Sequence, residues 1–499
     1  MPGLLSLPLL VLTLAPSAPP NVVFVLVDDL GYADLGCYGG EAFETPRIDR
    51  LAAEGVRFTD FYAACPVCSP TRASIQSGQY QTRLRITDFI PGHWRPFERL
   101  NVPYVADHLP LAIETPAELL AAADYRSGYF GKWHLGHARG PDRQGYDVAS
   151  VVNGHWLMEN PKQPGQMRRA GPAAAGATYG TDWMAAEATG FLDDHLAEHA
   201  EQPFFLFLSP FAVHIPLAAK ADAVAKYEQK LGGASGPDGP LPSPVYAAMV
   251  EHVDAMVGQV LDKLDEAGVA DETMVIVTSD NGGLYKMYTG QGHRVTDNGP
   301  LRGEKGTVYE GGIRVPCIVR WPGHAVAGGV CDEPAISVDF WPTLAQAAGV
   351  GPNDRTQRID GDSLVPLLHD PDATLGRDAI AWHYPHYHHM APAAAIRMGD
   401  WKLIRHFDGS DGRFDDSADE LYDLSDDIGE TQNRAGEESE KRAELAERLD
   451  TWLLEVDALL PSENPDADAD RAGEWWNRRT GQPLPAATTG RAHAQPDVR

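Results

Sequence analysis

"NVVFVLVDD", residues 21–29, is an unbroken run of β-branched and large apolar residues that ends in two carboxylates. Such a run is typical of a strand that is buried on both faces, as in the interior of a parallel sheet. The same pattern of an apolar run followed by polar residues recurs in "SGYFGKWH" (127–134), "PFFLFLSPFAVH" (203–214) and "TMVIVTSDNGG" (273–283). Helical stretches lie between these runs, such as residues 245–267. The alternation predicts an α/β fold with a large, mostly parallel doubly wound sheet and helices on both faces.

A second region begins at about residue 377. "AIRMGDWKLIRH" (395–406) and "DELYDLSDD" (419–427) indicate antiparallel strands with tight turns, and residues 437–459 have the spacing of an amphipathic helix. We therefore expect a catalytic domain over residues 20–376 and a smaller C-terminal antiparallel sheet with a packed helix over residues 377–460. The tail, residues 461–499, is rich in Asp, Ala and Pro, and we expect it to be loosely ordered.

The N-terminal residues 1–18 are interpreted as a signal peptide, which predicts export to the periplasm or the medium. Residues 4–14 form an apolar stretch of secretory length, and small residues follow it. The absence of Lys and Arg before Arg47 and the proline at position 19 argue against this interpretation, so a cytoplasmic location stays open. No segment reaches membrane-spanning length, and we expect no stable membrane association.

The formal net charge of −30 over 499 residues argues against nucleic acid as a partner. An anionic substrate would have to be captured by a local cluster of positive groups. The five cysteines are an odd number, and the sequence leaves open whether Cys37, Cys65, Cys317 and Cys331 form disulfides.

Two acidic pairs follow predicted strands, Asp28 with Asp29 and Asp280 with Asn281. Each pair could simply cap a following helix. Two pairs at the same edge of a sheet instead favour a metal site, because ligands of doubly wound sheets lie beyond the carboxyl ends of the strands. The donors are all oxygen atoms, which selects a hard cation, Ca²⁺ or alternatively Mg²⁺.

Positively charged and imidazole side chains form the second element of the predicted site. They fall in or beside loops, and several directly follow predicted strands: Arg72, Lys132, His134, His214 and Lys305. Together with a cation they would bind a tetrahedral oxyanion. Taken singly, each has an ordinary structural explanation, such as a solvated loop lysine.

Cys68 precedes Ser-Pro-Thr-Arg in "PVCSPTR" (66–72). Ser69 and Pro70 are typical of an N-cap and a first helical residue, which would place Cys68 at the mouth of a helix. Arg72 is one turn further on and can share its face. This heptapeptide alone favours a buried or disulfide-bonded cysteine over a nucleophile.

Together these stretches resemble the type I sulfatases of the alkaline phosphatase superfamily. Residues 68–72 match the C-x-P-x-R core of that family, and "YRSGYFGKWHLG" (125–136) and "PLRGEKGTVYEGGIRVPCIVRWPG" (300–323) are similar to further family blocks in the same order. The resemblance covers about residues 20–435. Gln76, Asp124 and Phe130 depart from the usual pattern at positions of packing rather than of chemistry.

The resemblance implies that Cys68 is oxidised to formylglycine by a maturation enzyme that recognises C-x-P-x-R. The hydrated aldehyde would attack sulfur with one hydroxyl, and loss of a proton from the other would eliminate sulfate. Asp28, Asp29, Asp280 and Asn281 would hold Ca²⁺, and Arg72 would orient the formylglycine. His134 would be the base for elimination. Lys132, His214 and Lys305 would hold sulfate oxygens. His214 or Lys305 would also assist the leaving group.

The predicted function is therefore the hydrolysis of sulfate esters, with sulfated carbohydrates as the expected substrates. One alternative is a phosphomonoester or phosphonate ester hydrolase of the same superfamily. Another is a non-catalytic binding protein in which Cys68 is never converted. "WHYPHYHH" (382–389) is the expected specificity segment, although such a cluster could equally be structural.

Overall fold

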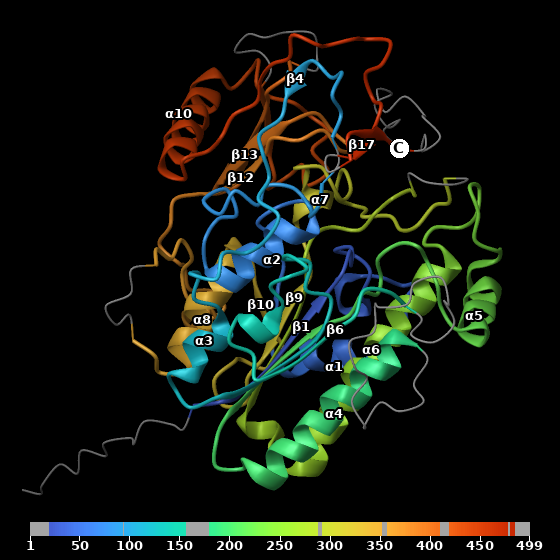
Figure 1. Ribbon diagram of the computed structural model, residues 1–499, viewed down its shortest axis with the longest axis vertical. Helices are drawn as coiled ribbons and strands as arrows, with labels where there is room; N and C mark the ends of the chain where they lie inside the picture. The colour runs from blue at the N-terminus through green and yellow to red at the C-terminus, as the bar shows by residue number, and fades with distance from the viewer. Residues whose placement is uncertain are drawn as a thin grey trace, which may run out of the picture.

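The computed structural model describes residues 19–92, 94–155, 179–287, 292–351, 357–409, 419–477 and 480–484. It shows a large sheet covered by helices and, above it in Figure 1, a smaller sheet with one long helix. The predicted signal peptide, residues 1–18, lies outside the described residues.

The large sheet is mixed but mostly parallel. Its strands lie in the order β10-β2-β9-β8-β1-β7-β5-β6. Within it β9 runs antiparallel to both of its neighbours, and the other described pairings are parallel. In that spatial order the strands span Gly329–Cys331, Val56–Phe58, Cys317–Arg320, Thr273–Ser279, Asn21–Val27, Phe204–Ser209, Arg126–Gly131 and Val148–Val151. The four apolar runs of the sequence are thus the neighbouring strands β8, β1, β7 and β5, and the predicted sheet is confirmed.

Strand β1 is buried on both faces, as its composition predicts. Val23, Val25 and Val27 belong to the core on one side of the sheet. The alternate residues Phe24 and Leu26 belong to the core on the other side. The period of two along a strand explains why an unbroken apolar run is needed here, since both faces are covered by helices.

Helices flank the sheet on its two sides (Figure 1). One side carries α1 (Pro46–Glu54), α4 (Gly180–Glu198) and α6 (Pro244–Ala267), with α5 (Ala221–Leu231) packed on α6. The other side carries α2 (Cys68–Ser77), α3 (Pro116–Ala121), α8 (Phe340–Ala347) and α9 (Val365–His369). Short elements complete this domain: η1 (Gly36–Tyr38), η2 (Pro141–Arg143), η4 (Ala270–Glu272), η5 (Ser337–Asp339), α7 (Glu310–Ile313), β3 (Phe61–Tyr62) and β11 (Ala335–Ile336). The helix expected at 245–267 is α6.

The C-terminal region forms the predicted antiparallel sheet, in the order β12-β13-β14-β15. These strands and the helix α10 packed on them span Ile380–Tyr384, Ala393–Met398, Trp401–His406, Asp419–Asp423 and Ser439–Glu455. A buried ion network joins this sheet to the large domain, because Lys402 lies 2.8 Å from both Glu310 and Glu430.

The first part of the tail forms two short strand pairings. Strand β16 (Ser462–Glu463) pairs with β4 (Leu100–Asn101), and β17 (Trp476–Asn477) pairs with β18 (Gln482–Pro483). The side chain of Asn464 donates to two backbone carbonyls of residues 96–98, which fixes the tail against that segment. Aromatic contacts add to these hydrogen bonds, because the Trp476 ring lies against those of Trp94 and Phe97. Residues 485–499 lie outside the described residues.

A search of the described helices finds none that is long and apolar enough to cross a membrane. All five cysteines fall within the described residues, and each is a free thiol.

Candidate active site

The predicted acidic residues meet at the carboxyl ends of two adjacent strands. Asp28 and Asp29 follow β1, and Asp280 and Asn281 follow β8. Adjacent side chains on a strand would point to opposite faces. Asp29 instead has φ 64°, a left-handed conformation in which the chain leaves the strand. Two carboxylates from neighbouring positions can therefore serve one site.

The geometry of this acidic set suits a hard cation. The carboxylate of Asp29 accepts a hydrogen bond from Asn281 Nδ2 at 2.8 Å. The backbone N–H of Asp29 donates to Asp280 Oδ1 at 3.2 Å. The carbonyl oxygen of the Asn281 side chain is buried without a hydrogen-bond partner among the described residues. A buried acceptor left unsatisfied is costly, and a cation at this point would satisfy it. The donor set therefore fits Ca²⁺ or Mg²⁺.

Two lysines from distant segments neutralise the acidic pair after β1. Lys132 Nζ lies 2.8 and 2.6 Å from the two carboxylate oxygens of Asp28. Lys305 Nζ lies 2.6 and 2.8 Å from those of Asp29, and 3.5 Å from Cys68 Sγ. Burial alone would raise the pKa of each carboxyl group, but the ammonium groups hold both pKa values below their usual range.

Arg72 joins the acidic strand ends to the helix that carries Cys68. Its Nε and Nη2 lie 2.8 and 2.7 Å from Asp280 Oδ2, and its Nη1 donates to the Ser209 hydroxyl at 2.6 Å and to the Lys132 carbonyl at 2.9 Å. The side chain is 2% exposed. Arg72 thus connects the carboxyl ends of strands β8, β7 and β5 through hydrogen bonds.

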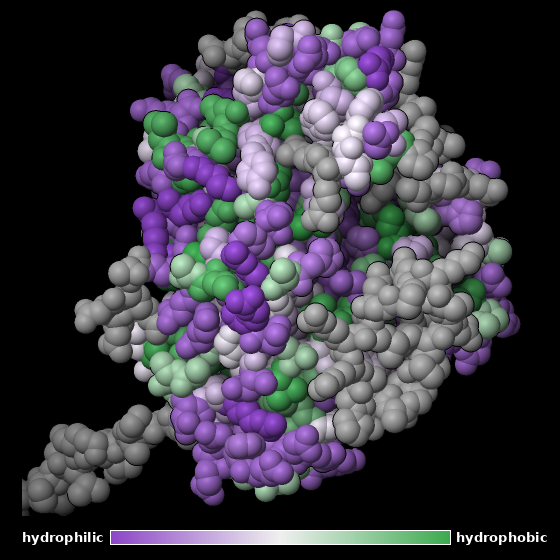
Figure 2. Space-filling model, viewed as in Figure 1, coloured by the Kyte–Doolittle hydropathy of each residue, from purple (hydrophilic) through white to green (hydrophobic). Residues whose placement is uncertain are grey.

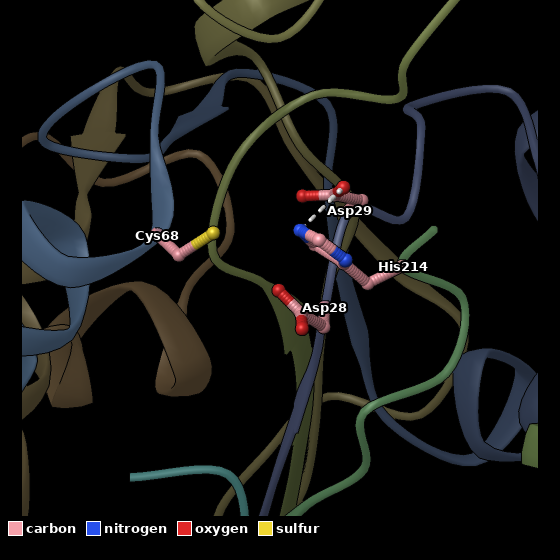
Figure 3. Close-up of side chains that lie close together, drawn as sticks. All are labelled: Asp28, Asp29, Cys68 and His214. Carbon is pink, nitrogen blue, oxygen red and sulfur yellow. Dashed lines mark ion pairs between the residues drawn. The ribbon is translucent and has the colours of Figure 1, made fainter. Parts of the chain in front are cut away.

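Cys68 lies at the start of α2, and its sulfur points toward Asp28, Asp29 and His214 (Figure 3). Ligand atoms of these four residues lie within 4.8 Å of one another. Burial raises the pKa of the Cys68 thiol to about 12, so the unmodified side chain is an uncharged thiol at neutral pH. A thiol in that state is a poor nucleophile.

The predicted cap of α2 needs a correction. The helix begins at Cys68 with Val67 as its N-cap, whereas Ser69 was expected in that position. The Ser69 hydroxyl instead donates to the His134 carbonyl at 2.8 Å and accepts from the Ile90 N–H at 3.0 Å. It is therefore used to tie two neighbouring loops to the start of the helix.

The two predicted histidines are both in the neutral form. Burial lowers the pKa of His134 well below its usual value, and burial lowers that of His214 to about 4. His134 Nε2 donates to the Ile90 carbonyl at 2.6 Å, which leaves Nδ1 as an acceptor that has no partner among the described residues. His214 donates through Nδ1 to the Ile215 carbonyl, and its Nε2 lies 3.7 Å from Asp29 Oδ2.

Sequence reasoning missed the residues that hold these loops in place. Ser209, at the end of β7, bonds Arg72, and its position at a strand end was a usable signal. Asn298 accepts from the Gly283 N–H at 3.0 Å and donates to the Gly283 and Gly303 carbonyls at 2.9 and 3.2 Å. It thereby connects the loop after β8 to the loop of Lys305. No pattern in the sequence distinguishes Asn298 from an ordinary loop asparagine.

Most of the expected specificity segment, residues 382–389, is buried. Trp382 donates through its indole to the Ala63 carbonyl at 2.8 Å, and His386 contacts the Thr87 hydroxyl at 2.8 Å. His389 is half-buried, and its Nδ1 lies 2.7 Å from the Lys305 carbonyl oxygen. The segment is thus largely structural at its start and adjoins the predicted site residue Lys305 at its end.

Comparison with known proteins identifies the relatives of this chain. A family model described as "Sulfatase" matches residues 20–350, and one described as "N-sulphoglucosamine sulphohydrolase, C-terminal" matches residues 303–458. The chain is 34% identical to arylsulfatase A of Homo sapiens over 418 residues, which cover 78% of this chain and 75% of the relative. It is also 34% identical to steryl-sulfatase of Mus musculus over 442 residues, covering 73% and 67%.

Among solved structures, the fold is similar to that of "Ps i-CgsB in complex with k-i-k-neocarrahexaose". The TM-score is 0.71 at 26% sequence identity, and the similarity covers 87% of this chain and 92% of the other.

Proposed function

The chain belongs to the sulfatase family and is a sulfuric ester hydrolase, and from this premise we propose how its residues act and which esters it cleaves. The proposal is that Cys68 is converted to formylglycine by a maturation enzyme and that the substrates are sulfated carbohydrates. The observation that carries it is the position of Cys68, whose sulfur lies among two carboxylates, His214 and the ammonium of Lys305. Burial raises the pKa of the Cys68 thiol to about 12, which makes the unmodified side chain a poor nucleophile and favours an oxygen nucleophile at this position.

Each charged residue has a role in this proposal. Asp28, Asp29, Asp280 and Asn281 would hold a divalent cation. When bound, the cation would supply positive charge that stabilises a developing anionic oxygen.

The lysines bind two oxygens of the sulfate group, because their ammonium groups are held by the adjacent carboxylates Asp28 and Asp29, and that of Lys305 lies 3.5 Å from Cys68 Sγ. His134 accepts the proton at Nδ1 from the hydroxyl of residue 68, since its Nε2 is already engaged with the Ile90 carbonyl. Lys305 protonates the leaving oxygen, because the hydrogen of the neutral His214 ring is engaged at Nδ1. Arg72 keeps the start of α2 aligned with the strand ends.

Sulfated carbohydrates are proposed as substrates because the solved structure with the TM-score of 0.71 is described in complex with "k-i-k-neocarrahexaose", a name that denotes a six-sugar oligosaccharide. The predicted signal peptide accords with this proposal, since an exported enzyme would meet sulfated polysaccharides. Localisation is tested by fractionation of cells that express the full chain.

The experiment has two parts. Protein co-expressed with a formylglycine-generating enzyme is digested, and the peptide containing Cys68 is analysed by mass spectrometry and with an aldehyde-reactive hydrazide. We expect an aldehyde at residue 68, and a thiol in fully active protein would overturn the proposed nucleophile. The same protein is then assayed with p-nitrophenyl sulfate, p-nitrophenyl phosphate and a panel of sulfated mono- and oligosaccharides. Preference for p-nitrophenyl phosphate over p-nitrophenyl sulfate would overturn the proposed substrate class. Cleavage of none of the sulfated saccharides would overturn it as well.

A further inference from the structure

The loop of residues 302–312 carries Lys305 and contacts two parts of the catalytic centre. The backbone N–H of the residue after Lys305 donates at 2.8 Å to the carbonyl of Pro66, just before the start of α2. The last residue of the loop, Gly312, accepts at 2.9 Å from the N–H of Gly282, which follows the acidic end of β8. A displacement of this loop would therefore move the Lys305 ammonium relative to the nucleophile and the acidic strand ends.

Glu430, in the turns after β15, holds both ends of this loop. Its Oε2 accepts from the backbone N–H of Glu310 at 2.7 Å, and its carbonyl accepts from Nη1 of Arg302 at 2.8 Å. The two ends also bond each other, since the N–H of Gly311 donates to the Arg302 carbonyl at 2.7 Å. This contact lies where α7 meets the C-terminal sheet (Figure 1). One residue of the C-terminal region thus closes the loop that carries Lys305.

The side chain of Glu430 lies in a fully buried network. Hydrophilic side chains are spread over the face shown in Figure 2, and the surface is where charged groups ordinarily lie. Glu310, Lys402 and Glu430 instead have 0% exposure. Lys402 bridges the two carboxyl groups at 2.8 Å each, and Glu310 also accepts from the Tyr62 hydroxyl at 2.7 Å and from Arg314 at 3.2 Å. These contacts from several elements fix the position of Glu430.

The backbone of Glu430 indicates that its side chain has a specific use. Its φ is 50°, in the left-handed region that glycine adopts at lower cost. A larger residue persists in this region where its surroundings determine its conformation. The hydrogen bonds of Glu430 to the two ends of the loop are contacts of this kind, and glycine could make only the one through its carbonyl.

We propose that Glu430 is a positioning residue for Lys305, and that it fixes the loop of residues 302–312 so that the Lys305 ammonium reaches the leaving oxygen. The inference rests on the proposed function, in which Lys305 protonates that oxygen. Proton transfer requires the donor within hydrogen-bond reach of the acceptor, so a small shift of the loop lowers the rate. The C-terminal region thereby acts on the reaction through the loop that it holds.

The test is a double-mutant cycle in the mature enzyme, assayed with p-nitrophenyl sulfate and with phenyl sulfate, whose leaving oxygen is more basic. Glu430→Ala should lower kcat for p-nitrophenyl sulfate about tenfold, and kcat for phenyl sulfate further, because a more basic leaving group depends more on protonation. In a Lys305→Met background the same substitution should change either rate less than about twofold, since the two residues act as one unit.

Glu430→Gln tests whether the hydrogen-bond acceptor, rather than the charge, is needed. Burial raises the pKa of Glu430 to about 7, so glutamine resembles the uncharged form of the native group. Its amide oxygen can accept from the N–H of Glu310, and we expect Glu430→Gln to recover most of the activity lost in Glu430→Ala. If Glu430→Ala does not fold, Arg302→Met releases the other end of the loop and enters the same cycle.

Asp419→Asn is the matched control, because Asp419 is a buried carboxylate on β15 that pairs with Arg405 at 3.0 Å within the C-terminal sheet. It should keep the wild-type ratio of the two substrates even if its melting temperature falls. No loss in Glu430→Ala, or an equal loss in both backgrounds, would overturn the positioning role and leave the proposed function intact. A thiol at residue 68 of active protein would overturn the proposed nucleophile, and the cycle would still report whether Glu430 acts through Lys305.

Discussion

Replacing Lys305 by methionine removes one ammonium group from the catalytic centre and keeps most of the side-chain volume. The structure places this ammonium between Asp29 and Cys68, with Asp29 oxygens at 2.6 and 2.8 Å and the sulfur at 3.5 Å. Lys132→Met is the companion variant, since Lys132 makes the equivalent pair with Asp28. Both substitutions remove a charge that would otherwise contact a sulfate oxygen.

The size of the effect follows from the burial of these groups. A charge-assisted hydrogen bond contributes about 1.5–3 kcal/mol. If it is made fully in the transition state, its loss lowers kcat/KM by roughly tenfold to a hundredfold. The paired carboxylate also loses its partner, and breaking a buried pair costs about 3–5 kcal/mol of stability. Activity must therefore be measured well below the melting temperature of each variant.

The assay is the hydrolysis of p-nitrophenyl sulfate by variants whose conversion at residue 68 has been measured. Lys441→Ala is the control, because Lys441 is half-buried on α10 and its ion pair among the described residues is with Glu444. Its kcat/KM should equal that of the wild-type enzyme. A folded and fully converted Lys305→Met variant with kcat/KM within about twofold of wild type would refute the reasoning.

Three further predictions concern the nucleophile, the cation and the stability. Cys68→Ala should abolish activity and retain the wild-type circular dichroism spectrum; residual turnover above that of a mock purification would contradict the proposed nucleophile. Asn281→Leu removes the unsatisfied buried oxygen and should weaken Ca²⁺ binding at least about tenfold in calorimetry; an unchanged affinity would exclude this ligand. Burial raises the pKa of Asp254 to about 6, above the value of about 3.9 in unfolded chains, so its contribution to stability falls as pH rises from about 4 to 6. The non-titrating Asp254→Asn should therefore gain about 1–3 kcal/mol relative to wild type between pH 4 and pH 7, and equal pH dependence of the two melting temperatures would contradict this.

The large sheet could be predicted because its strands are encoded locally. Each apolar run is buried on both faces, and this requirement leaves a continuous pattern in the sequence. The polar residues after the runs could be grouped for the same reason, since strands β1 and β8 are parallel neighbours and their ends coincide. Asp28 and Asp280 both lie within ion-pair distance of Arg72 as a consequence of this strand order.

What could not be predicted depends on contacts between segments that share no local pattern. The hydroxyl of Ser69 looks like a helix cap, but two loops that are distant in sequence use it instead. Asn298 connects two active-site loops through three hydrogen bonds that any loop asparagine could make. The position of Trp475 beside His388 follows from how the tail packs on residues 94–98, and the tail's composition does not encode that packing.

The charge balance of the centre explains why an acidic protein can act on an anionic ester. The carboxylates of Asp28, Asp29 and Asp280 face the permanent cations Arg72, Lys132 and Lys305. His134 and His214 are neutral, because burial lowers the pKa of both. The protein groups alone therefore sum to zero, and the acidic pairs would leave little attraction for a sulfate ester. A divalent cation would add two positive charges at a buried point where water cannot screen them. That excess matches one negative charge on the ester and one on a deprotonated nucleophile. In the proposed site the carboxylates would retain the cation, and the lysines would keep the charge of the cation from being cancelled.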